Sequence, residues 1–454
     1  MNWLKALLPR NRSVAPVPKR IPREQHAVSR SRISPGTLRT LYGLKDAGYE
    51  AYMVGGGVRD LLAGIEPKDF DVATNATPEQ TRRVFRSCRP IGRRFVICHV
   101  RFGDEITEVT TFRGPITDSH ERDETGRILS DNEYGTLETD AWRRDFTVNA
   151  LYYDIRDYSI VDLVGGLEDL QRREIRMIGD PELRYREDPV RMLRAIRIAN
   201  KLGFTIHRKT AEPIAQLAAL LREIPPARLF DEVVKLLQTR EAVANFEGLR
   251  AHGLLRHLLP QSERAMDQPV AHRFVTRALE NTAERLANEQ SVSPAFLYAA
   301  LLWPAVAREY QRLVGSEGQH PNVAIAQASD TVLAKAQQHI TIPKRFSLPM
   351  REIWLLQPRL ESSRGGRVQR QLTHPRFRAA YDFLLLRAEA GEVASSLAEF
   401  WTQAQAGEPV TAPPADHDDD VGMGEERPAA PRKRRRRRRR GGGGGSTPAP
   451  VTTG

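Results

Sequence analysis

The stretch KDFDVATNATPEQ, residues 68–80, places two aspartates one residue apart in a strand-forming run. Because side chains alternate between the two faces of a strand, Asp69 and Asp71 are expected to point the same way while Phe70 enters a core. Two like charges on one face repel each other unless a cation lies between them. The pattern therefore predicts a cation-binding carboxylate pair, with a loop-end turn or a helix cap as the alternative.

A glycine-rich turn precedes this pair. VGGGVRD, residues 54–60, ends one predicted strand and begins a helix. Glycines at such a junction let backbone N–H groups approach a phosphate, and a helix N-terminus adds partial positive charge. Gly55, Gly56 and Arg59 are thus candidate ligands of a nucleotide triphosphate. Two Mg²⁺ ions about 3.5–4 Å apart at the carboxylates would hold an attacking hydroxyl and a leaving pyrophosphate.

A third carboxylate is expected from a neighbouring strand. In DEITEVTTFR, residues 104–113, Glu108 shares a strand face with Ile106 and Thr110. Arg113 follows in the turn and is a candidate phosphate ligand. Glu108 is equally compatible with a solvated strand edge, so both interpretations stay open.

Two later segments combine arginine with acid. In DAWRRDFTVNALYYD, residues 140–154, Arg144 and Asp145 precede a mostly apolar run, and a surface ion pair between them is the simple alternative. In YREDPVRMLRAIRIA, residues 185–199, spacings of three put Asp188, Arg191 and Arg194 on one helical stripe. A carboxylate and a guanidinium held together offer an acceptor and a donor to a base edge. An amphipathic helix with charged outer turns is the alternative.

The pattern of elements indicates an α+β protein. Strands and helices alternate up to about residue 180, and helical periodicity follows almost throughout. We therefore expect a head with a small mixed or antiparallel sheet, followed by all-α domains and a disordered Arg-rich tail. The expected divisions are an N-terminal extension (1–33), the head (34–180), a first helical domain (181–260), a C-terminal helical domain (261–406) and the tail (407–454).

Charge is concentrated near the C-terminus. The formal net charge is +12, and residues 432–440 supply nine positive charges in the run RKRRRRRRR. The surrounding Pro, Gly, Thr and acidic residues predict disorder, and such a run attracts phosphate backbones without regard to sequence. The predicted RNA-binding residues are Arg432, Lys433, Arg434, Arg435, Arg436, Arg437, Arg438, Arg439 and Arg440. A spacer or solubility tail is the alternative, and RNA-decay proteins are candidate partners of the tail.

Other features limit the class of protein. No apolar run approaches the roughly 18–20 residues that cross a bilayer, which argues against a transmembrane segment. The start, MNWLKALLPRNR, predicts a frayed helix rather than a membrane anchor, and residues 13–22 have the composition of a linker. The two cysteines, Cys88 and Cys98, match neither a disulfide framework nor a zinc site, so a cytoplasmic location is expected.

Three separated motifs carry a family resemblance. GGGVRDLLAGIEPKDFDVAT (55–74), RRDFTVNALYYD (143–154) and REDPVRMLRAIR (186–197) resemble, in order and spacing, the class II nucleotidyltransferase superfamily of bacterial poly(A) polymerases and tRNA CCA-adding enzymes. The resemblance implies that Asp69 and Asp71 bind two catalytic Mg²⁺ ions and that Asp145 belongs to the active site. It also implies that Asp188 and Arg191 recognise the base of ATP, and Glu108 matches the third acid. Arg144, Asn149 and Arg194 complete the expected ATP site.

The strand region resembles the poly(A) polymerase branch. IGRRFVICHVRFGDEITEVTTFR, residues 91–113, carries this likeness, although Val96 stands where that branch often has arginine and the tail is nearly pure arginine. The implied function is template-independent transfer of AMP from ATP to RNA 3′ ends, with a role in RNA polyadenylation, processing and decay. The resemblance also implies that the head (34–180) is the nucleotidyltransferase catalytic domain, that the domain 181–260 binds nucleotide and RNA, and that the helical domains as a whole bind RNA. A CCA-adding enzyme and a catalytically inactive RNA-binding protein are the alternatives; the intact aspartate pair argues against the latter.

Overall fold

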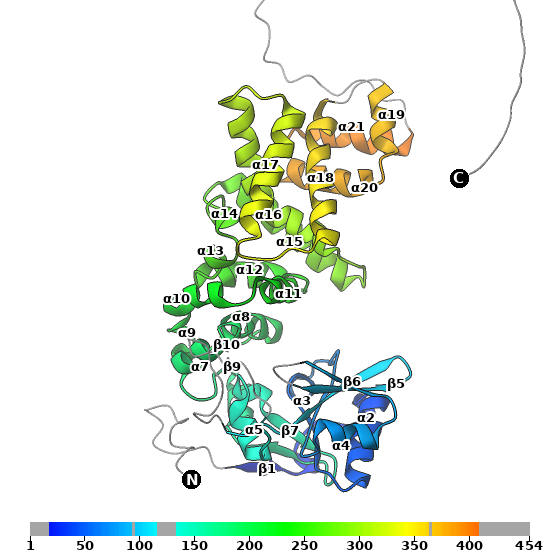
Figure 1. Cartoon of the computed structure of the whole chain (residues 1–454), viewed down its shortest axis with the longest axis vertical. Coiled ribbons are helices and arrows are strands. Elements are labelled where there is room, and N and C mark those ends of the chain that lie inside the picture. The colour runs from blue at the N-terminus through cyan, green and yellow to red at the C-terminus, as the bar shows by residue number, and fades with distance from the viewer. Residues whose placement is uncertain (1–17, 93–95, 116–132, 363–365, 408–454) are drawn as a thin grey trace, which may run out of the picture. The chain divides into compact units, whose positions relative to one another are not determined.

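The computed structural model describes residues 18–92, 96–115, 133–362 and 366–407. It confirms the α+β class: Figure 1 shows the longer strands of the first part of the chain gathered with a few short helices, and helices in the rest. The strands are β1 (Lys19–Ile21), β2 (Ala51–Val54), β3 (Asp71–Thr74), β4 (Cys88–Ile91), β5 (Ile97–Phe102), β6 (Glu105–Thr111), β7 (Leu151–Asp154), β8 (Ile160–Asp162), β9 (Glu174–Ile175) and β10 (Thr205–Ile206).

The helices of the first half are α2 (Pro35–Asp46), α3 (Gly56–Leu62), α4 (Pro78–Val84), α5 (Leu137–Arg143), α6 (Gly166–Arg172), α7 (Pro181–Glu187), α8 (Val190–Leu202), α9 (Arg208–Ala211) and α10 (Ile214–Leu217). Those that follow are α11 (Pro226–Leu237), α12 (Ala242–Ala251), α13 (Leu255–Leu258), α14 (Pro260–Glu263), α15 (Pro269–Ala287), α16 (Pro294–Gly315), α17 (Pro321–Ala336), α18 (Lys344–Ser362), α19 (Gly366–Leu372), α20 (Phe377–Glu389) and α21 (Ser395–Ala406). Short 3-10 helices cover Arg23–Gln25, Arg30–Arg32, Thr147–Asn149 and Ala218–Glu223.

One mixed sheet of eight strands forms the head, in the order β1-β8-β7-β2-β3-β6-β5-β4. Only β3 and β6 pair in parallel; the other neighbours are antiparallel. A second, two-stranded parallel sheet joins β9 to β10. The predicted mixed sheet is confirmed, although it is larger than expected.

Alternating side chains of the central strands build two cores. Met53 and Val72 belong to a buried cluster with residues of α2 and α3, whereas their neighbours Tyr52 and Ala73 belong to a cluster with residues of α5. The sheet is therefore covered on one face by α2 and α3 and on the other by α5 (Figure 1). This two-sided burial fixes the register of the strands that carry the predicted site.

The helical part has its own hydrophobic core. Its largest buried cluster runs from Phe146 through α8, α11 and α16 to Ala390, and a smaller one joins α18, α20 and α21. Within the residues that the structure describes, no helix combines the length and apolar character needed to cross a membrane.

Local signals gave several elements correctly. The sequence TPEQTRRVF, residues 77–85, predicts a helix capped by Thr77, and it forms α4, with Pro78 first and a complete capping box between Thr77 and Gln80. The turn residues Gly103 and Asp104 predict a hairpin, and this hairpin joins β5 to β6.

Three expectations need correction. β3 begins at Asp71, so Asp69 lies in the preceding loop rather than on the strand. The segment Lys19–Ile21, expected within a linker, forms β1 and pairs with β8. The sequence AEPIAQLAALLREI, residues 211–224, has the pattern of one helix, but Pro213 separates α9 from α10, because proline cannot donate a helical hydrogen bond, and a 3-10 helix follows α10.

Candidate active site

Two neighbouring strands bring carboxylates together at one place on the sheet. In the β3–β6 register Asp71 lies directly opposite Glu108, and in the β2–β3 register it lies opposite Val54 at the end of β2. Burial and the Glu108 carboxylate raise the pKa of Asp71 to about 6, against the opposing charge of Arg144, with Asp69 adding to the rise. The structure thus places the three predicted acids close enough together for Glu108 and Asp69 both to raise the pKa of Asp71.

The glycine turn lies against this cluster. Gly55 has φ +76°, a conformation that residues with a side chain rarely adopt. A Cβ atom there would lie 3.6 Å from Oδ2 of Asp71 and 3.7 Å from Nη1 of Arg144. Gly56 begins α3 immediately afterwards. The bare backbone therefore adjoins both an acidic group and a guanidinium, as a phosphate cradle beside a cation site requires.

Arg144 is held by partners that the sequence did not single out. Its Nε and Nη2 donate to Oδ2 of Asp140 at 3.1 and 2.9 Å, and Nε also donates to the Tyr152 hydroxyl at 2.9 Å. Burial favours the neutral form, but Asp140 and Tyr152 outweigh it and raise the pKa of Arg144. Arg144 pairs with Asp140 instead of the suggested Asp145; their spacing of four residues was the available signal.

Asp145 faces the helix α8. Its Oδ2 accepts from Nε and Nη2 of Arg194 at 2.7 and 2.6 Å, and its Oδ1 accepts from the Asn149 amide at 3.0 Å. Burial alone would raise the pKa of Asp145, but Arg194 and these hydrogen bonds lower it well below the usual range. Asn149 accepts from Nη1 of Arg59 at 2.6 Å. Three predicted ATP-site residues, Arg59, Asn149 and Arg194, thus form one continuous network with the predicted catalytic residue Asp145.

The predicted base-recognition motif is paired differently from expectation. Arg191 donates to Oε2 of Glu187 at 2.5 Å, while Oδ2 of Asp188 accepts from Arg228 of α11 at 2.9 Å. Burial would raise the pKa of Glu187, yet Arg191 and Arg184 lower it to about 2. The sequence missed Arg228, whose only signal was its place in the first turn of the amphipathic α11.

Some predicted residues are not brought to the carboxylates. Arg113 follows β6 beyond Thr111, which pairs with Thr74 at the far end of β3 from Asp71. Its backbone N–H donates to Oδ1 of Asp140 at 3.2 Å, and Oδ2 of the same carboxylate holds Arg144. The run 432–440 and the segment 93–95 lie outside the described residues.

The donor set suits Mg²⁺ only with help from a substrate. Among the residues that the structure describes, no group of three or more Asp, Glu, His or Cys side chains is preassembled around a metal position. Mg²⁺ is normally held by one or two carboxylates, with waters and substrate phosphates as its other ligands. Asp69, which is exposed, and Asp71 beside the glycine turn fit that requirement.

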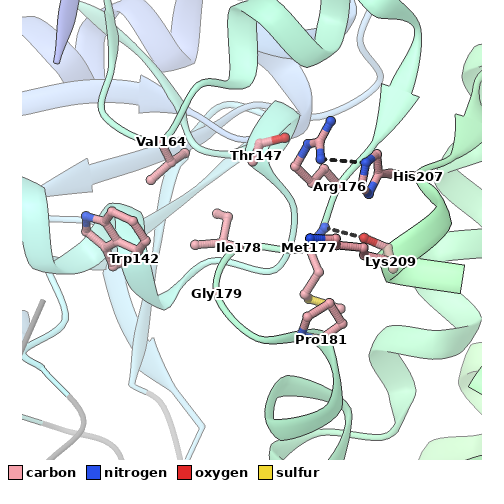
Figure 2. A pocket seen from close by; sticks show the side chains of 11 residues that line it. Trp142, Thr147, Val164, Arg176, Met177, Ile178, Gly179, Pro181, His207 and Lys209 are labelled. Atoms are coloured by element: carbon pink, nitrogen blue, oxygen red, sulfur yellow. Dashed lines mark hydrogen bonds between the residues drawn. The ribbon is translucent and has the colours of Figure 1, made fainter. Parts of the chain in front are cut away.

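A separate pocket of about 210 Å³ lies where the chain leaves the sheet domain (Figure 2). Trp142 and Thr147 line it from one side, and the segment 176–181 with His207 from the other. Arg176 is engaged there by Asp169 at 2.9 Å and by Nε2 of His207 at 2.7 Å. None of the predicted catalytic or ATP residues lines this pocket, and it is smaller than usual ligand sites of about 300–1,000 Å³.

Comparison with known proteins identifies the family. The chain is 48% identical to Poly(A) polymerase I of Salmonella typhi over 400 residues, and the aligned region covers 86% of each chain. The identity to Poly(A) polymerase I of Escherichia coli O157:H7 is also 48%, over 87% of this chain and 86% of the relative. The chain belongs to the poly(A) polymerase family.

Family models mark three regions of this poly(A) polymerase family member. The model of the poly A polymerase head domain matches residues 51–176, which contain the carboxylates and Asp145. The model described as the probable RNA and SrmB-binding site of polymerase A matches residues 203–266. The model of the polymerase A arginine-rich C-terminus matches residues 317–441, including the arginine run.

This chain shares its fold with solved structures of CCA-adding enzymes. The Bacillus stearothermophilus CCA-adding enzyme in complex with CTP is 28% identical, with a TM-score of 0.54 over 83% of both chains. The Thermotoga maritima CCA-adding enzyme complexed with tRNA is 19% identical, with a TM-score of 0.56 over 84% of this chain and 83% of that one. The second likeness concerns the fold alone.

Proposed function

We propose that the chain is a template-independent polynucleotide adenylyltransferase that transfers AMP from ATP to the 3′ end of RNA. The observation that carries the proposal is the 48% identity to Poly(A) polymerase I of Salmonella typhi over 86% of both chains. The acidic cluster beside a bare glycine turn supplies the chemistry that such a transfer needs.

Asp69 and Asp71 would hold two Mg²⁺ ions, with Glu108 as a third acid beside them. When bound, Mg²⁺ lowers the pKa of a coordinated hydroxyl and neutralises phosphate charge. In the reaction the RNA 3′-oxygen forms a bond to the α-phosphorus of ATP, and the bond from that phosphorus to the β-phosphate oxygen breaks. The hydroxyl proton passes to solvent, and pyrophosphate leaves.

The protein groups position the triphosphate. Gly55 and Gly56 leave backbone N–H groups open to phosphate oxygens, and Arg144 supplies a fixed positive charge next to them. Because Asp140 and Tyr152 hold this guanidinium in place, it needs little reorganisation when charge develops on the phosphates. Positioning and charge neutralisation supply most of the acceleration in phosphoryl transfer.

The choice of ATP is assigned to the start of α8. Asp188 and Arg191 are each held by a partner outside the pair, Arg228 and Glu187 respectively. Fixed donors and acceptors match one base edge and leave unpaired polar groups against another, which is costly in a buried site. Asp145, Asn149 and Arg194 connect this base site to the glycine turn.

RNA contacts are assigned to the helical part. The match of residues 203–266 to an RNA-binding family model supports this placement, and the arginine run 432–440 would add sequence-independent affinity. Partners among RNA-decay proteins remain a proposal for the same tail. Cys88 and Cys98 are free thiols, which fits the proposed cytoplasmic location.

Incubating the purified chain with an unstructured RNA and each nucleoside triphosphate separately tests the function. The expected product is a long homopolymer with ATP and little extension with CTP, GTP or UTP. Absence of extension with every nucleotide would favour an inactive RNA-binding protein.

The CCA-adding alternative has an observation in its favour. The chain is 42% identical to the CCA-adding enzyme of Lactobacillus helveticus, although over only 44% of its length. Such an enzyme would add two cytidines and one adenosine to a tRNA lacking its CCA end and then stop. Equal use of CTP and ATP on that tRNA would replace our proposal with this alternative.

A further inference from the structure

Asp60 is a buried carboxylate that joins two parts of the ATP site. Its Oδ1 accepts from Nε and Nη2 of Arg59 at 2.8 and 2.6 Å, while its Oδ2 accepts from Nζ of Lys201 at 2.7 Å. Asp60 lies on α3, directly after the glycine turn, and Lys201 lies near the end of α8. The side chain of Asp60 is 3% exposed and that of Lys201 is 38% exposed.

These contacts close a ring that begins and ends on α8. From Lys201 it passes through Asp60 and Arg59 to Asn149, and from there to Asp145 and back to Arg194. Arg194 and Lys201 are seven residues apart, two helical turns or about 10 Å along one face of α8. The helix is therefore fastened to the head at two separate points.

The face of α8 between the two fastening points is also cationic. Arg197 lies there, and burial together with the charges of Arg194 and Arg59 lowers its pKa, which places it near Arg59 as well. The ring itself holds three cations and two carboxylates. The net charge of the ring is therefore +1, and Arg197 adds to the positive charge next to the predicted triphosphate cradle, where an anion is favoured.

We propose that Lys201 is a positioning residue: through Asp60 it holds α8 against the glycine turn and fixes the orientation of Arg59 and Asn149 for ATP. The inference rests on the proposed function, because it assigns the ring to nucleotide binding. Base recognition at the start of α8 and triphosphate binding at α3 are then coupled through this contact, and the RNA end is not involved.

The test compares full-length Lys201→Met and Lys201→Arg with the wild type. Methionine keeps the aliphatic stem and removes the charge, whereas arginine retains a cation able to reach Asp60. Lys45→Met is the matched control, because Lys45 is exposed on α2, where its ammonium lies over the ring of Tyr42, and neither residue is assigned to the ATP site. Asp60→Asn and the double variant with Lys201→Met test whether the two residues act together.

We expect Lys201→Met to raise KM for ATP about 3- to 10-fold, because the lost ion pair joins a partly exposed lysine to a buried carboxylate. The values of kcat and of KM for RNA should stay within about 2-fold of the wild type. Lys201→Arg restores KM for ATP, Lys45→Met leaves KM for ATP unchanged, and the double variant is no worse than Asp60→Asn. A purely structural role would instead lower Tm and kcat together.

An unchanged KM for ATP in Lys201→Met, no rescue by arginine, or additive effects in the double variant would overturn the proposal. Equilibrium binding of ATP to each variant, without RNA, gives a readout besides activity. If the wild type extends RNA with another nucleotide instead of ATP, the proposed function fails, and the Kd of that nucleotide across the same variants decides the role of Lys201.

Discussion

Asp71 and Glu108 lie directly opposite each other on the only parallel strand pair of the eight-stranded sheet. Because β3 and β6 are adjacent in the sheet, this register brings two carboxylates from segments far apart in the chain to the same level of the sheet. Gly55 brings the backbone of the glycine turn to the same place. Charge repulsion stored in this cluster is what a divalent cation would relieve.

The glycine turn should tolerate no side chain. Gly55→Ala places a methyl group between Asp71 and Arg144 and should reduce AMP transfer strongly, besides costing about 1–3 kcal/mol of stability for the backbone conformation. Gly64→Ala is the control, because Gly64 has φ +79° with nothing within 4 Å of its Cβ position. Steady-state kinetics and thermal unfolding of both variants separate the two effects. Equal loss of activity in both would contradict the assignment of the turn.

Base selection should depend on Arg228 as well as on Asp188. Asp188→Ala and Arg228→Ala are each expected to lower the ratio of kcat/KM for ATP to that for CTP by about 10-fold or more, because the remaining partner loses its fixed position. Arg208→Ala, which removes an arginine that is 88% exposed, should leave the ratio unchanged. Retention of full ATP preference in Arg228→Ala would show that this contact has no part in selection.

The sequence predicted the parts of the site that depend on local pattern. The turn at Gly55, the capped helix after Thr77 and the hairpin at Gly103 follow from neighbouring residues alone. Arg228 and Lys201 were missed because their partners, Asp188 and Asp60, lie 40 and 141 residues away. No periodicity encodes a contact across such distances.

The boundary of β3 was misplaced for a similar reason. DFDVAT has a strand-like pattern from its first residue, yet pairing with β2 begins only at Asp71, opposite the last residue of β2. The length of the partner strand thus fixed where β3 starts. Likewise β1 exists because β8 offers an edge, which the linker-like composition around Lys19 did not reveal.

Stability in acid should reveal the charge on Glu187. Its pKa lies near 2 in the folded chain and is 4.5 ordinarily, so ionised Glu187 stabilises the fold above pH 4.5, and this contribution is lost as the pH falls toward 2. The difference in unfolding free energy between the wild type and Glu187→Gln should be constant from pH 7 to 5 and narrow below about 4.3. Glu182→Gln on the same helix, where the glutamate is 58% exposed, is the control. Denaturant unfolding at several pH values measures the free energy of unfolding of each variant. A difference between the wild type and Glu187→Gln that widens in acid would contradict the lowered pKa of Glu187.

Removing residues 409–454 should weaken RNA binding while sparing the chemical step at saturating RNA. Each phosphate neutralised on a single strand contributes about −0.7 to the slope of log K against log salt, and about half of the nine cations should engage, so the slope should fall by roughly 2–4. Binding isotherms at several salt concentrations measure the slope. An unchanged slope would leave the tail as a spacer, and a collapsed rate with saturating RNA would place it in the active site.

If Asp69 and Asp71 hold the Mg²⁺ ions as proposed, AMP transfer depends on both carboxylates, and the single-turnover rate of ATP addition to RNA measures this dependence. Asp69→Asn and Asp71→Asn each remove one charged oxygen at nearly constant volume. Loss of an outer contact of a metal site costs about 10- to 100-fold, so loss of a direct ligand should exceed about 100-fold, with Tm and ATP binding little changed. We predict that neither variant retains more than a few per cent of the wild-type rate at saturating Mg²⁺. A rate near that of the wild type in either variant would contradict the proposal that both aspartates hold the catalytic Mg²⁺ ions.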